Sequence, residues 1–174
     1  ATFQADPNYE LKNERDYSKP ENQQRVIEQS SETQFNPRYH ITDNPDSTNG
    51  PVWIDEQGNA LGGNSRAMML QRVYGRNGEA AKSYRELLEK SAAHYGVDPS
   101  AVGAMEQPVL VRVTSSKTLQ NLPGGSKWAI RKANVSGTAA LSASERAAAD
   151  AGQMSPDLLS HVAGAIDRKS TRLN

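Results

Sequence analysis

The sequence predicts an α/β domain in which helices flank a small mixed sheet. Two short runs, residues 52–55 and 60–61, surround a turn at 56–59 and indicate a hairpin. Apolar residues then recur at helical spacing, most clearly at Tyr84, Leu87, Leu88, Ala92 and Tyr95, with Gly96 as a C-cap. The nearly continuous apolar run at 108–113 predicts a strand covered on both faces. A strand that follows two helices favours a mixed sheet over a hairpin protein.

The N-terminal third is polar and rich in turn signals. Residues 1–17 contain no usable period and predict an extended N-terminal arm. The Ser-Lys-Pro-Glu pattern at 18–21 predicts a capping box and a helix that runs to about residue 31. Closely spaced Asn-Pro and Gly-Pro pairs between residues 32 and 51 predict a loop, with a short strand at 39–42.

The C-terminal part predicts short helices separated by polar loops. Residues 114–125 indicate a loop, residues 128–134 a helix, and Ser142 and Ser155 open two further helices. We therefore expect an arm at 1–17, a domain at 18–166 with its core at about 39–134 and C-terminal helices at 135–166, and a non-native tail at 167–174.

Composition narrows the function classes. The 174 residues are 36% hydrophobic and 23% charged, with a mean hydropathy of −0.74, so the polar segments are expected outside a smaller packed unit. Formal net charge is zero, and residues 1–49 carry five basic against nine acidic residues, which does not indicate a concentrated basic face for nucleic acid. The absence of cysteine excludes disulfides, thiolate zinc sites and thiol catalysis.

No apolar run approaches membrane-spanning length and no signal segment opens the chain, so we expect a cytoplasmic protein without a membrane partner. None of the three histidines, His40, His94 and His161, has a second histidine or a cysteine three or four residues away. The spacing of the residues also identifies no catalytic nucleophile with a neighbouring base. We therefore assign no metal ligands and no catalytic residues.

The candidate ligand site is the glycine turn at the exit of the hairpin. Gly62 and Gly63 let a ligand approach the backbone closely, and the helix that starts after them has free N–H groups that favour an anion. Arg66, in the first turn of that helix, adds a permanent charge whose planar fork suits phosphate oxygens. The same glycine pair is also compatible with an ordinary hairpin exit, and it matches neither a P-loop nor a dinucleotide fingerprint.

The run at 51–68, Pro-Val-Trp-Ile-Asp-Glu-Gln-Gly-Asn-Ala-Leu-Gly-Gly-Asn-Ser-Arg-Ala-Met, resembles the signature of the ParB/sulfiredoxin superfamily. More narrowly, it resembles the DdrB-like ParB domains of phage and mobile-element polyvalent proteins, in which an Asn-Pro-Asp segment, here 44–46, precedes the hairpin. Residues 15–17 and 108–113 fit the same layout, and residues 134–147 are similar to the ParB box Glu-Asn-x-Gln-Arg-x-x-Leu-x-Pro-x-Glu. The resemblance covers roughly residues 8–165.

The resemblance implies a ParB-like fold that holds nucleotide phosphates at the glycine turn. Carried over, Gly62 and Gly63 supply close backbone approach, Asn64 the helix cap, Ser65 a hydroxyl or backbone N–H, and Arg66 the charge clamp. Asn134 resembles the ParB asparagine that helps to bind the metal and phosphates. The implied ligand is a nucleoside triphosphate of CTP or ATP type, with Mg²⁺ as cofactor.

Two departures from the family pattern limit the implied chemistry. Asn64 stands where sulfiredoxin has its catalytic cysteine, which excludes sulfinic-acid repair. Ala133 stands where the ParB box has glutamate, which weakens the case for Mg²⁺-assisted hydrolysis. Weak NTPase activity is therefore left open.

We expect a nucleotide-binding or phosphate-binding ParB-like domain in a bacterial or phage-infected host cell. Two alternatives belong to other classes: a DNA-binding, partition-like accessory module, and a catalytically degenerate interaction domain that contacts other domains of a larger polyprotein. The partners expected are thus a nucleotide, and on the alternative readings DNA or other polyvalent-protein domains.

Overall fold

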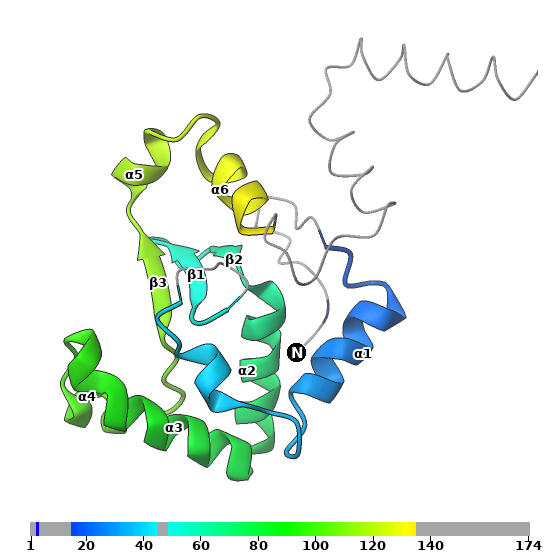
Figure 1. The fold of residues 1–174 in the computed structure, drawn as a ribbon, viewed down its shortest axis with the longest axis vertical. Coiled ribbons are helices and arrows are strands. Elements are labelled where there is room, and N and C mark those ends of the chain that lie inside the picture. Colours follow the sequence, from blue (N-terminus) through cyan, green and yellow to red (C-terminus); the bar gives the residue numbers. More distant parts are fainter. Residues whose placement is uncertain (1–2, 4–14, 45–48, 135–174) are drawn as a thin grey trace, which may run out of the picture. The chain divides into compact units, whose positions relative to one another are not determined.

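The computed structural model describes residues 3, 15–44 and 49–134, which form a mixed α/β domain (Figure 1). Strand β1 (Val52–Asp55) lies in the centre of a three-stranded sheet of order β2-β1-β3. It pairs antiparallel with β2 (Ala60–Gly62), with an irregularity between Trp53 and Ile54, and parallel with β3 (Val111–Thr114). The mixed sheet confirms the predicted fold class and the hairpin.

Helices cover both faces of this sheet. In chain order the helices are α1 (Pro20–Gln29), the short 3₁₀ helix η1 (Pro37–His40), α2 (Asn64–Arg76), α3 (Glu79–Ser91), η2 (Ala92–Tyr95), α4 (Pro99–Ala104), α5 (Ser116–Gln120) and α6 (Gly125–Asn134). Because side chains alternate along a strand, neighbouring residues of β1 enter different cores. Val52 packs with α2 and α3, whereas Trp53 packs with Leu119 of α5 and Ala129 of α6.

The larger core lies between the sheet and α2 and α3. Its buried members include Leu70, Val73, Tyr74, Ala81, Tyr84 and Leu88. Two of its tyrosines also fix the entry to β3: the Tyr74 hydroxyl donates to the Pro108 carbonyl at 2.5 Å, and the Tyr84 hydroxyl accepts from the Leu110 N–H at 3.4 Å. The helical spacing predicted for this region is therefore confirmed, and Gly96 ends η2 with φ of +71°.

The strand predicted at 108–113 is shorter than expected and is not covered on both faces. Pro108 has no N–H and the Leu110 N–H is bonded to Tyr84, so strand pairing begins only at Val111. Since β3 is the edge of the sheet, Val113 remains 59% exposed. The continuous apolar run therefore predicted the strand correctly, but the prediction that both faces of the strand are covered is wrong.

Three other local predictions are wrong. The strand at 39–42 is replaced by η1, because Pro37 opens a 3₁₀ turn and the Asn36 side chain accepts from the Arg38 N–H at 3.1 Å. The loop at 114–125 contains α5, whose first turn is capped by Ser115 accepting from the Thr118 N–H. The capping box at 18–21 is absent, because Ser18 bonds Asp16 instead, although Pro20 does open α1.

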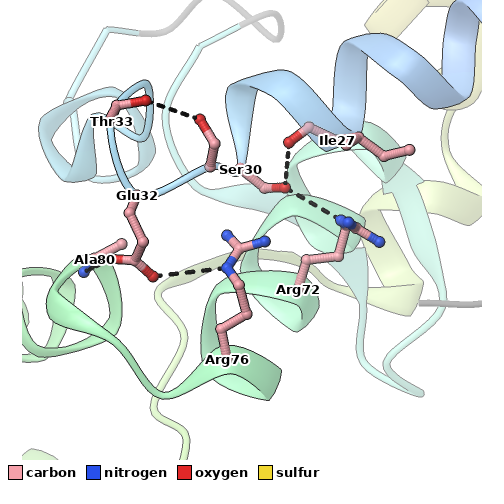
Figure 2. Close-up of polar contacts among 8 residues, drawn as sticks. Ile27, Ser30, Glu32, Thr33, Arg72, Arg76 and Ala80 are labelled. Atoms are coloured by element: carbon pink, nitrogen blue, oxygen red, sulfur yellow. Dashed lines mark hydrogen bonds and ion pairs between the residues drawn. The ribbon is translucent and has the colours of Figure 1, made fainter.

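Polar contacts at the end of α1 attach it to α2 and α3 (Figure 2). Arg72 Nε donates to the buried Ser30 hydroxyl at 3.2 Å, and that hydroxyl donates to the Ile27 carbonyl. Glu32 accepts from the Ala80 N–H at 2.8 Å, inside the first turn of α3, and pairs with Arg76 at 3.6 Å. These contacts hold the end of α1 against the second half of α2 and the start of α3.

Several expectations lie outside the described residues: most of the arm at 1–17, the helices opened by Ser142 and Ser155, the C-terminal helices at 135–166 and the tail at 167–174. Within the described part of the chain, the helices are too short and too polar to cross a membrane.

Candidate functional site at the hairpin exit

Asp55 shapes the hairpin that leads into the candidate site. Its side chain is 6% exposed, and Oδ1 accepts from the backbone N–H groups of Gln57 at 2.9 Å and Asn59 at 2.8 Å. Oδ2 accepts from the Asn59 side-chain amide at 2.9 Å. One buried carboxylate therefore satisfies three donors of a tight turn, which aligns β2 and sets the position at which the chain enters α2.

Gly63 is the N-cap residue of α2 and lies in the left-handed region, with φ of +85°. A Cβ built on Gly63 would come within 2.6 Å of Nη2 of Arg66, so glycine is required here by packing as well as by conformation. Asn64 is the first helical residue, and the cap position before it belongs to Gly63, which has no side chain to make a cap bond. The expectation that Asn64 caps the helix is therefore wrong, because the left-handed Gly63 takes the cap position.

Arg66 points into the protein. It is 3% exposed, and its Nη1 donates to the Gly50 carbonyl at 2.8 Å. The guanidinium thus connects the loop before β1 to the first turn of α2, with the Gly63 backbone against its face. A charge-assisted bond of this kind in a buried place contributes roughly 1.5 to 3 kcal/mol to folding. The structure gives Arg66 an internal role that the sequence pattern did not indicate.

His40 lies beside Arg66 in an aromatic cluster. Its ring stacks on Phe35 at 4.9 Å and meets the edge of Tyr84 at 6.1 Å. The imidazole is 2% exposed, and its Nδ1 has no hydrogen-bond partner in the described residues. Burial, together with the positive charge of Arg66, lowers the pKa of His40 to about 4. His40 is therefore neutral near pH 7, and its ring packs among the aromatic side chains of Phe35 and Tyr84.

Tyr17 is half-buried and its hydroxyl lies near Ser65 in the first turn of α2. Burial raises the pKa of the Tyr17 hydroxyl, and hydrogen bonds from the side chain and the backbone of Ser65 act in the opposite direction, as do the charges of Arg15 and Arg25. Ser65, in the first turn of α2, therefore lies close enough to the Tyr17 oxygen to act on its pKa. Apart from the fit of residues 15–17 to the family layout, no sequence pattern indicates that Tyr17 lies beside Ser65.

Arg25 supplies an exposed charge near the same helix start. It extends from α1 close enough to lower the pKa of Tyr17, and it makes no hydrogen bond or ion pair within the described part of the chain. Arg15 lies nearby and donates to the Asn22 side chain at 3.5 Å. Sequence reasoning missed Arg25, because the fold alone brings α1 against α2.

The two other predicted site residues, Gly62 and Asn134, lie in different elements of the fold. Gly62 is buried in β2, opposite Trp53. Asn134 is the last residue of α6, and residues 135–147, which carry the rest of the second resemblance, lie outside the described residues. A groove of about 450 Å³ runs along β3, lined by Thr42, Asp43, Tyr95, Val113 and neighbours, and contains none of the predicted site residues.

No group of three or more histidine, aspartate or glutamate side chains converges on a metal position within residues 15–44 and 49–134. Asp55, the buried carboxylate nearest in sequence to the glycine turn, is taken up by Gln57 and Asn59. These side chains do not fit a Mg²⁺ cage built from protein carboxylates, so we assign no hydrolytic step to them.

The geometry defines a class of protein, a small α/β domain with a mixed sheet. Its hairpin leads through a glycine turn directly into a helix whose first turn carries a buried arginine. The family comparison agrees with this class. A family model described as the ddrB-like ParB superfamily domain matches residues 5–115, and the chain belongs to that family. No curated protein and no solved structure matches the chain.

Proposed function

We propose that this ParB-like domain binds the phosphates of a nucleoside triphosphate where β2 passes into α2. The observation that carries the proposal is the start of α2, where Gly63 holds the cap position without a side chain and the exposed Arg25 of α1 lies nearby. There, Ser65 lies beside the Tyr17 oxygen, and the charges of Arg15 and Arg25 act on the same oxygen. A phosphate oxygen is a stronger acceptor than a neutral phenol, and a helix N-terminus with nearby arginines favours an anion. The ligand would replace the Tyr17 oxygen.

The proposed roles follow from the positions of the residues. Ser65 donates its hydroxyl and N–H, and Asn64, at the first helical position, offers a further N–H. Arg25 is the outer charge clamp, in place of the role first expected for Arg66. Arg66 holds Gly63 and the loop at Gly50 in place and adds positive charge beneath the turn.

In this proposal Mg²⁺ is bound mainly by the phosphates of the nucleotide. This ion keeps several waters and usually binds through substrate phosphates and one or two protein oxygens. Asn134 is the amide that the family resemblance offers for this purpose. The protein residues orient the triphosphate, and the ion contributes charge neutralisation.

Calorimetric titration of the full chain with CTP, ATP and GTP in the presence of MgCl₂ tests the proposal. We expect binding of at least one triphosphate, weakened roughly fivefold to tenfold by Arg25→Ala, the loss typical of one charged hydrogen bond at a partly exposed site. Lys90→Ala is the matched control, because Lys90 lies on α3 and pairs with Glu86 at 3.8 Å. Absence of heat for all three nucleotides at millimolar concentration would contradict the proposal.

One observation favours a second candidate, a degenerate interaction domain in which the glycine turn serves folding alone. Arg66 fills the space above Gly63 and is bonded to Gly50, which explains both residues without a ligand. On this reading, no nucleotide changes the melting temperature of the protein. A nucleotide that binds only the folded state raises the melting temperature. At a ligand concentration one hundred times Kd, it adds about 2.7 kcal/mol to the free energy of unfolding.

A further inference from the structure

Helices α5 and α6 carry an unusual concentration of positive charge. Residues 115–134 contain Lys117, Lys127, Arg131 and Lys132 and no aspartate or glutamate. Since the whole chain has a formal net charge of zero, the other residues together carry −4. This segment of twenty residues therefore carries a net charge of +4, a feature that the charge balance of the whole chain conceals.

The basic residues of α6 share one face of the helix. Lys127 and Arg131 are separated by four residues, as are Trp128 and Lys132, so the four positions form two adjacent rows. The three cations are exposed, and Trp128 is half-buried with Lys132 Nζ 5.6 Å from its ring centroid. The opposite side of the helix, with Ala129 and Ile130, is buried against Leu61 and Leu119.

The lysines of this face are not used in ion pairs with described residues. Lys82 and Lys90 of α3 show the contrast, because each pairs with a glutamate three or four residues earlier in the same helix. Glu56 is the carboxylate that reaches α5, and it accepts from both the N–H at 2.9 Å and the hydroxyl at 2.6 Å of Ser116. Like charges placed close together cost free energy of folding, so ion pairing within the described residues does not explain why Lys127 and Lys132 lie on the same helix.

We propose that the outer face of α5 and α6 binds a nucleic acid strand. Lys127, Arg131 and Lys132 fit the phosphate backbone, which supplies regularly spaced negative charges. Trp128 offers an aromatic surface beside these cations, and Lys132 now lies over its ring. When Lys132 turns to contact a phosphate, an unpaired base can stack on the ring in its place. An acidic polypeptide would satisfy the charges but would leave the exposed part of Trp128 without a partner of matching shape. The surface is separate from the start of α2.

Fluorescence anisotropy of a dye-labelled, mixed-sequence 20-nucleotide single strand, titrated with the full chain, tests the proposal. Lys127→Ser/Arg131→Ser/Lys132→Ser should weaken binding at least tenfold. It should also reduce the slope of log K against log salt by about 2, because each single-strand phosphate contact contributes about 0.7. The matched control Lys82→Ser/Lys90→Ser removes two exposed lysines from α3 and should leave affinity within twofold. Circular dichroism verifies that both variants are folded.

Further readouts separate a nucleic acid site from a general anionic surface. Tryptophan fluorescence should fall when the strand binds, and this quench should be lost in Trp128→Phe. Equal competition by poly-glutamate of the same charge would overturn the proposal in favour of an acidic protein partner. Equal weakening by the α3 control variant, or no binding at low salt, would also overturn it. Triphosphate binding at α2 should be unchanged in the α6 variant, so the two proposals fail independently.

Discussion

The molecule contains two glycine pairs that each lead into a helix, and their surroundings differ. At the first pair, a Cβ on Gly63 would come within 2.6 Å of the Arg66 guanidinium, which is buried and bonded to Gly50. At the second, the nearest atom to a Cβ on Gly124 is 3.8 Å away, and on Gly125 it is 3.7 Å away. The first turn packs against the buried Arg66 side chain, whereas the second precedes a helix whose cations, Lys127, Arg131 and Lys132, are exposed.

This difference shows that a glycine pair before a helix does not by itself identify a ligand site. Both pairs have glycine at positive φ, so conformation requires glycine in each. What distinguishes them is where the nearby charges point. Arg66 is 3% exposed, whereas Lys127, Arg131 and Lys132 of α6 are exposed. The cations exposed to solvent are therefore those of α6 at the second turn and Arg25 of α1, not Arg66, at the first turn.

The largest expected effect is that of Arg66→Ala. Removing a buried charged donor and leaving the Gly50 carbonyl without a partner should lower the free energy of unfolding by roughly 3 to 4 kcal/mol. Urea denaturation measures this change. Arg131→Ala, at an exposed position on α6, is the comparison and should change stability by about 0.5 kcal/mol or less. If both variants are equally stable, Arg66 is not a structural residue and the contrast between the two turns is lost.

Acid should destabilise the region under the first turn through His40. The folded-state pKa is about 4, below the ordinary value of 6.5, so between these pH values the unfolded chain binds a proton that the folded protein does not. The contribution of His40 is therefore fully present above pH 6.5 and is lost as pH falls to 4, by about 3 kcal/mol in total.

Urea unfolding of the wild type and of His40→Phe at several pH values isolates this effect from other groups. Phenylalanine keeps an aromatic ring against Phe35 and Tyr84 but binds no proton. The difference in free energy of unfolding between the two proteins should change steeply between pH 6.5 and 4. A constant difference across that range would show that His40 titrates normally and that the cluster is open to water.

Alanine at the two glycine turns compares them directly. Gly124→Ala forces a side chain into the left-handed region at φ of +89° without a contact closer than 3.8 Å, and should cost about 1 kcal/mol. Gly63→Ala adds the displacement of Arg66 and should cost about 1 to 2 kcal/mol more than Gly124→Ala. Thermal or urea unfolding gives both values. Equal costs would mean that Arg66 moves aside freely.

The smallest expected effect is that of Tyr17→Phe on nucleotide affinity. Without the phenol oxygen, Ser65 keeps its donors free for a phosphate, so triphosphate affinity should rise roughly threefold. Ser65→Ala removes one of the donors and should lower affinity instead. Calorimetry measures both. If Tyr17→Phe weakens or abolishes binding, Tyr17 is part of the ligand site rather than its competitor.

The sequence was sufficient for the elements with strong local signals. The hairpin, the helices after it and the parallel strand follow from periodicity and turn residues, and the family follows from the run at 51–68. The errors arise where a tertiary contact decides the outcome. Residue Val113 is exposed because β3 has no second neighbour, and Ser18 bonds Asp16 instead of capping α1.

The candidate site was predicted only in part for the same reason. Spacing placed Gly62 and Gly63 at the hairpin exit and Ser65 and Arg66 in the first turn of the following helix, which is where they lie. It gave no information on the direction of the Arg66 side chain, which depends on the Gly50 carbonyl sixteen residues away. Arg25 and Tyr17 reach the site from outside the motif, through α1 and the residues before it.

Backbone amide NMR of the isotope-labelled protein tests the central claim most directly, because one experiment observes both helix starts. Addition of a nucleoside triphosphate with Mg²⁺ should shift the amides of residues 62–66 and leave those of residues 125–132 in place. The single strand should do the reverse. Triphosphate shifts confined to α6, or none at the glycine turn before α2, would contradict the assignment of the phosphate site to that turn.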